Sequence, residues 1–123
     1  MAQWLGQFSG HTHETRVEDA EASLRHAIEA CRAGDGNSVE AGKKARSIIQ
    51  LAERLQRARS KLWKARLSAA IEGSAGSTRV ERDKRIETVR RKYEVVRDAS
   101  VPDILSEFGA QHVPILAQKK EVS

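Results

Sequence analysis

The chain contains few of the residues on which covalent chemistry depends. Its 123 residues include one cysteine, Cys31, which excludes an intrachain disulfide framework and fits a reducing compartment. No stretch approaches the roughly 20 apolar residues of a membrane span. The segment from Met1 to Gly10 has neither the basic region nor the apolar run of a signal peptide. We therefore expect a soluble, cytoplasmic protein with no membrane partner.

Aromatic residues are also scarce. The chain has five: Trp4, Phe8, Trp63, Tyr93 and Phe108. The core must therefore consist mostly of Leu, Ile, Val and Ala and will be thin, which suggests that some helix surface is buried against a partner or a second copy. The shortage of rings also argues against an open platform on which nucleic-acid bases could stack.

No group of residues is typical of an enzyme active site. The glycine-rich stretch from Gly73 to Ser77 lacks the lysine and the flanking strand of a phosphate-binding P-loop. No two carboxylates stand out as an acid–base pair, and Cys31 has no identifiable base nearby. His11 and His13 lie two positions apart, but nothing completes a tetrahedral metal set. We expect a protein that is not an enzyme and that has no cofactor and no metal.

The spacing of apolar residues predicts an all-α fold. No alternation with period two is long enough for a strand, whereas apolar residues recur at helical spacing in three long segments. Turn signals at 34–37 and 73–77 separate these segments. The sequence predicts one domain, an antiparallel helical bundle or hairpin of three long helices with a short C-terminal fourth helix. The expected elements are an N-terminal apolar arm (1–14), helices at 15–33, 38–72 and 78–99, a short helix at 102–108 and a tail at 109–123.

Local signals set the predicted helix boundaries. Residues 15–18 and 78–81 have the spacing of a capping box, in which the first turn exchanges side-chain and backbone hydrogen bonds. Pro102 suits the first turn of the short helix, and Gly109 is expected to end it. Residues 112–116 are expected to be extended.

The second predicted helix carries the strongest charge asymmetry. From Lys43 to Arg66 it has nine bases and one acid, Glu53, a local charge of +8 in a chain whose total is +5. The first 40 residues instead carry seven acids and three bases. Clustered Lys and Arg bind phosphates because each neutralised phosphate releases counterions, although such a run can also be a solvated face. The candidate contacts to DNA or RNA are Lys43, Arg46, Arg54, Arg57, Lys61 and Lys64, followed by Arg82, Arg85, Arg90 and Arg91 on the third helix.

Two further arginines of the second helix, Arg59 and Arg66, fall inside its apolar seam. An unpaired charge is not stable when it is buried there. Either a carboxylate of the first helix meets them (Glu18, Glu21 or Glu29), or this half of the seam is an interface. The third alternative is that their stems lie along the core while their charged ends reach solvent.

Two functions remain open from the sequence. The first is a non-catalytic basic subunit that binds a nucleic-acid phosphate backbone without base-specific readout, within a larger nucleoprotein complex. The second is a protein–protein adaptor or a self-assembling structural protein, a homo-oligomer in which the acidic first helix of one copy meets the basic second helix of another. Its candidate docking residues are aromatic or apolar, at the chain ends and on a second stripe of the second helix: Trp4, Leu5, Phe8, Ile49, Trp63, Leu67 and Phe108.

Overall fold

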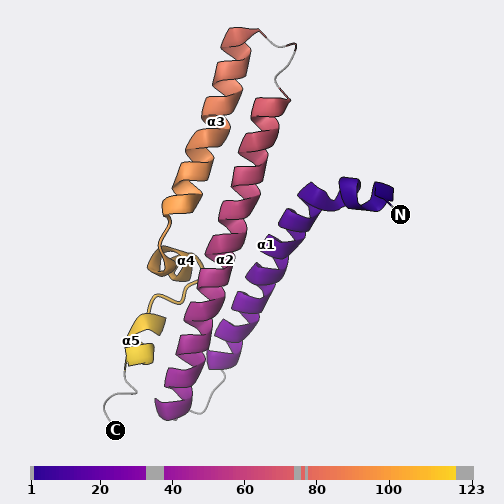
Figure 1. The fold of residues 1–123 in the computed structure, drawn as a ribbon. Helices are drawn as coiled ribbons and strands as arrows, with labels where there is room; N and C mark the ends of the chain where they lie inside the picture. Colours follow the sequence, from indigo (N-terminus) through magenta and orange to yellow (C-terminus); the bar gives the residue numbers. More distant parts are fainter. Residues whose placement is uncertain (1, 33–37, 74–75, 77, 119–123) are drawn as a thin grey trace.

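The computed structural model describes residues 2–32, 38–73, 76 and 78–118. Within these residues the protein is helical and contains no strand, which confirms the predicted all-α class (Figure 1). The elements are α1 (Ala2–Arg32), α2 (Ser38–Glu72), α3 (Arg79–Asp98), α4 (Val101–Glu107) and α5 (Val113–Gln118). None of these helices combines the length and the apolar character that crossing a membrane requires.

The longest helix, α2, is the element against which the other four pack. Its 35 residues give it a length of about 50 Å. Figure 1 shows α2 between α1 and α3, with α4 and α5 beside its first half. A helix with a neighbour on more than one side needs more than one apolar stripe, and the sequence of α2 has two. Its bounds are those predicted from the sequence.

The structure corrects the two ends of the predicted fold. Residues 2–14 belong to α1 rather than to an arm that precedes a helix start at Thr15. The capping-box spacing predicted a helix start at Thr15. A capping residue needs a non-helical backbone, but Thr15 lies within α1, and no proline interrupts the helix there. The segment predicted to be extended, 112–116, instead leads into α5. Pro114 occupies the first turn of α5, where a missing N–H costs nothing, and Val113 is buried in the core.

Capping explains where α3 and α4 begin and end. The Thr78 hydroxyl accepts from the Glu81 N–H at 3.2 Å, as predicted, and α3 starts at the next residue. A second capping box, which sequence analysis missed, opens α4: Ser100 and Asp103 each accept from the other's backbone N–H. Gly109 follows α4 with φ of +71°, a conformation that glycine adopts readily.

The buried core surrounds the first two thirds of α2. It joins four helices, α1, α2, α4 and α5, and the segment that follows α4, and it consists of Ala20, Leu24, Ile28, Ala45, Ile48, Ala52, Leu55, Ile104, Leu105, Ala110 and Val113. By contrast, α3 has no buried residue. Its predicted stripe is only half-buried: Ile86, Val89, Tyr93 and Val96. The outer part of α2 and α3 therefore extends beyond the main core.

Arg59 joins three helices near the middle of α2. Its Nη2 donates to Glu21 of α1 at 3.1 Å and to Glu107 of α4 at 2.8 Å, while its Nη1 donates to the other Glu107 oxygen at 2.9 Å. The two parallel bonds to Glu107 form the bidentate fork that makes arginine–carboxylate pairs strong. Glu21 was one of the three predicted partners, whereas Glu18 and Glu29 are exposed. The hydrogen bonds from Arg59 lower the pKa of Glu107 below its ordinary value.

The position of the core predicts where mutations are costly. Leu55 is 0% exposed, so Leu55→Ala should lower the free energy of unfolding by about 2–5 kcal/mol through lost burial and a cavity. The matched control is Val95→Ala on α3, where the side chain is 67% exposed and the change should stay within about 0.5 kcal/mol. Urea denaturation measures both. Equal losses at the two sites would contradict this location of the core.

The Arg59 cluster predicts a pH dependence. Because the pKa of Glu107 is lowered in the folded protein, the pair stabilises the fold above the ordinary glutamate value of 4.5 and is lost as the pH falls through the lowered pKa. Glu107→Gln should therefore destabilise at about pH 7, by less than about 1 kcal/mol because Glu107 is 53% exposed, and should have a smaller effect at about pH 3. Urea denaturation at both pH values tests this, with Glu18→Gln on the exposed face of α1 as the control. A penalty of the same size at both pH values would exclude the ion pair as its cause.

Candidate functional site

The exposed basic residues of α2 lie on one line. Spacings of three, four and eleven residues place them on a single face of the helix, and we name this set the α2 basic line: Lys43, Arg54, Arg57, Lys61 and Lys64. The buried residues Ile48, Leu55 and Leu62 belong to the opposite face. From its first to its last member the line spans roughly 30 Å. The packing of the core thus directs five cations away from the protein.

The charges of this line are not neutralised by the parts of the protein that the structure describes. None of its five side chains forms an ion pair with another described residue, whereas Arg59 and Arg66 of the same helix do. Arg66 pairs with Glu14 of α1 at 3.2 Å and is 41% exposed, so its charged end reaches solvent as well as a carboxylate. Glu21 and Glu14 of α1 therefore pair with the arginines in the seam of α2, and the outer face of α2 keeps its positive charge.

Arg46 lies apart from the exposed line. Its side chain is half-buried, and its Nη1 is shielded from solvent with no hydrogen-bond partner. Sequence spacing alone placed this residue among the candidate phosphate contacts. In the structure it is less accessible than its neighbour along the helix, Lys43.

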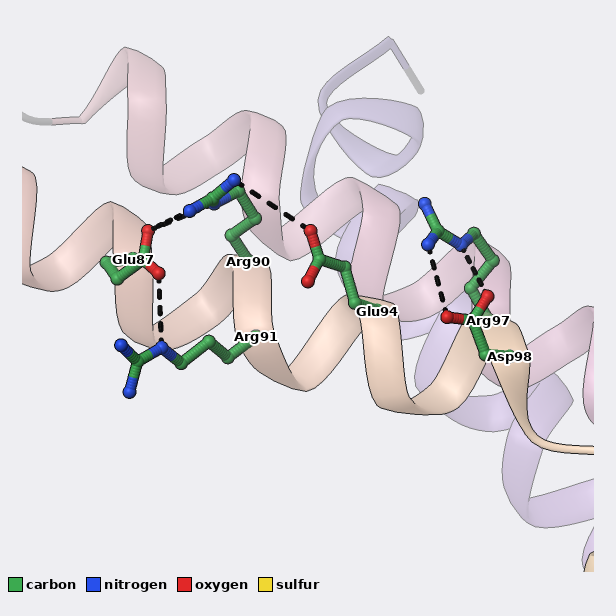
Figure 2. A network of polar contacts seen from close by, with 6 residues as sticks. All are labelled: Glu87, Arg90, Arg91, Glu94, Arg97 and Asp98. Atoms are coloured by element: carbon green, nitrogen blue, oxygen red, sulfur yellow. Dashed lines mark hydrogen bonds and ion pairs between the residues drawn. The ribbon is translucent and has the colours of Figure 1, made fainter.

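The basic residues of α3 divide into paired and unpaired groups. Figure 2 shows Glu87 accepting from both Arg90 and Arg91, with Arg90 also 3.9 Å from Glu94. Hydrogen bonds from Arg90 and then Arg91 lower the pKa of Glu87. These pairs have the i, i+3 and i, i+4 spacings of helix surface pairs, so the sequence contained a signal that they would be neutralised.

The remaining cations of α3 lie toward its start. Arg82 and Arg85 are exposed and have no ion-pair partner among the described residues. Arg79 and Lys84 share these properties, although the sequence analysis did not select them. The first half of α3 thus presents more free positive charge than the second half.

The predicted docking residues are largely in contact with the protein itself. The charged groups of Arg66 and Lys92 lie 4.5 Å and 5.7 Å from the ring centroid of Trp63. The charged group of Arg25 lies 5.4 Å from the ring centroid of Phe108. Phe108 and Ile49 also pack against the core, while Leu67 is half-buried. The side chains of Trp4, Leu5 and Phe8 fall outside the described part of the structure; their backbone belongs to α1.

One groove, of about 410 Å³, lies beside Trp63 and is lined by α1, α2, α3 and residues of α4. Its walls are mostly apolar, including Val17, Leu62 and Val96. Of its three charged residues, Arg59 and Glu107 are hydrogen-bonded to each other, and Lys92 lies over the ring of Trp63. Among the described side chains no group of three His, Cys, Asp or Glu residues is placed to hold a metal ion.

Comparison of the chain with known protein families, curated proteins and solved structures finds no match.

Proposed function

We propose that this protein binds the phosphate backbone of a nucleic acid through the α2 basic line, without reading the base sequence. The observation that supports this is the row of five exposed cations that have no acidic partner among the described residues. Phosphates would neutralise them and release counterions, which is the main driving force of backbone binding. We propose further that the protein is a subunit of a larger nucleoprotein complex rather than an enzyme.

The energetics of α2 support a role for this row. Arg54, Arg57, Lys61 and Lys64 succeed one another at i, i+3 and i, i+4 positions, where like charges destabilise a helix by about 0.2–0.5 kcal/mol for each pair. On α3, in contrast, acids interleave with the arginines and remove this repulsion. A polyanion would relieve the repulsion on α2, so the free protein retains an unfavourable arrangement that binding converts into a favourable one.

Base recognition has less support. Cations along one face of a helix can contact backbone phosphates, which carry no sequence information. Arg82 and Arg85 extend the positive surface onto α3, while Arg90 and Arg91 contribute less because Glu87 already neutralises part of their charge. We therefore order the predicted contacts with the α2 basic line first and the second half of α3 last.

A second candidate function is that of a protein–protein adaptor or homo-oligomer. The observation in its favour is that α3 buries no residue and leaves Val80 and Val95 66% and 67% exposed. Apolar side chains on an uncovered helix are typical of surfaces that meet another protein, although single exposed residues are also common. Binding of nucleic acid through the α2 basic line and docking through Val80 and Val95 would use different residues and are compatible.

Neutralising the α2 basic line should remove binding. In Arg57→Gln/Lys61→Gln/Lys64→Gln, the salt dependence of binding to duplex DNA, expressed as the slope of log K against log salt, should become shallower by about 2.7, because each lost phosphate contact removes about 0.9. At about 0.1 M salt this corresponds to an affinity lower by two to three orders of magnitude. Fluorescence anisotropy with a labelled duplex measures both quantities, and circular dichroism checks that helicity is kept.

The matched control changes the same amount of charge at paired positions. Arg90→Gln/Arg91→Gln/Arg97→Gln also removes three positive charges, but from side chains that contact Glu87, Glu94 or Asp98. It should alter the slope by less than about 1. If both triple variants lose affinity equally, net charge rather than the α2 basic line determines binding. If neither loses affinity, the line is not the site.

Docking through α3 has its own test. Val80→Ser/Val95→Ser should lower the mass seen by light scattering at high concentration if copies associate through α3, because the change removes apolar area from the contact. A wild-type mass equal to that of a single chain at every concentration would count against self-association.

A further inference from the structure

The described aromatic rings are already occupied by cations of the same chain. Arg66 and Lys92 lie over Trp63, Arg97 lies over Tyr93 at 5.6 Å, and Arg25 lies over Phe108. Each distance is within the roughly 6 Å of a cation–π contact. A base that stacked on one of these rings would have to compete with a cation that already lies over it.

The α2 basic line itself contains no ring. Between Lys43 and Lys64, the uncharged exposed positions along it are Ser47 and Gln50. Trp63 precedes Lys64 in the sequence, but it lies beside the groove between α2 and α3 rather than on the exposed face. Single-stranded nucleic acids are held by a basic groove together with rings on which successive bases stack. The line offers the positive charge without the stacking.

The shape of the line also suits a stiff ligand. One straight helix of roughly 30 Å presents the five cations on a convex surface, about the length of one turn of a double helix. A duplex carries one charge for about every 1.7 Å of its axis and needs no ordering to lie along such a rod. A single strand has fewer charges within reach and would lose conformational freedom on straightening.

We infer that the nucleic acid bound by the α2 basic line is a double helix rather than a single strand. This inference rests on the proposed function, since it identifies the ligand of the same surface. The size of the preference follows from counterion release. With five phosphates neutralised, slopes of about 0.9 for each phosphate on a duplex and about 0.7 on a single strand give a duplex affinity about tenfold higher at 0.1 M salt.

The test compares strands of one sequence. A labelled DNA duplex of about 20 base pairs, roughly two helical turns, is titrated with the full-length protein, and so is its own single strand, over a range of salt concentrations. An RNA duplex and its single strand of the same sequence form the second arm. We expect the duplex to bind about tenfold more tightly in at least one arm, with the steeper salt slope.

Two negative results are possible, and they would overturn different claims. Equal or tighter binding of the single strands in both arms would overturn the inference and leave backbone binding intact. Absence of binding to all four probes at low salt would overturn the proposed function and the inference together.

Trp63 provides an independent readout in the same titration. The variant Trp4→Phe leaves Trp63 as the one tryptophan, since the chain has two. If the rings take no part, duplex binding should leave the emission of Trp63 unchanged at saturation. Quenching of Trp63 in step with binding would show that a base stacks on it, and this would overturn the argument from occupied rings.

Discussion

A charge within an apolar seam is the constraint on which the arrangement of helices depends. Arg59 lies on the core side of α2, where it requires carboxylates, and it obtains them from α1 and α4. Both helices are thereby held against the same face of α2, near the middle of its length. Two further hydrogen bonds also connect separate elements: Gln56 of α2 donates to the Ala99 carbonyl after α3, and Arg32 of α1 donates to the Gly109 carbonyl after α4. Because Glu14 and Glu21 of α1 pair with this side of α2, the opposite face keeps its positive charge.

Whether an arginine of α2 or α3 forms an ion pair depends on whether an acid lies within reach. Along α3, sequence neighbours supply that acid, and Glu87 alone serves two arginines. In the seam of α2 the acid comes from another helix, as Glu14 does for Arg66. The outer face of α2 has one exposed acid, Glu53, among five cations, and none of these cations forms an ion pair with another described residue. A net charge of +5 for the whole chain conceals this separation, which arises because folding pairs some charges and leaves others in solvent.

Sequence analysis was most reliable where a signal acts locally. The bounds of α2, the Thr78 cap and the glycine after α4 follow from periodicity and from the geometry of helix ends. It failed where tertiary packing decides the outcome. Val113 makes α5 helical by entering the core, although its short segment has no helical pattern. At Thr15, by contrast, the residue spacing of a capping box is present although no helix begins there. For Arg59 the sequence left open one of three acids of the first helix, an interface or solvent, and only the fold identifies Glu21 and adds Glu107 from a distant part of the chain.

The absence of buried side chains in α3 has a consequence for the motions of the protein. The free energy needed to open a segment locally increases with the apolar contacts that opening breaks. Residues of α1, α2 and α4 share the central core, whereas α3 contributes half-buried side chains and surface ion pairs. Its backbone amides should therefore exchange with solvent through an opening that leaves the rest of the protein folded. We therefore expect α3 to open more readily than the helices that share the core, and the ion pairs within α3 to favour its helical form when it does.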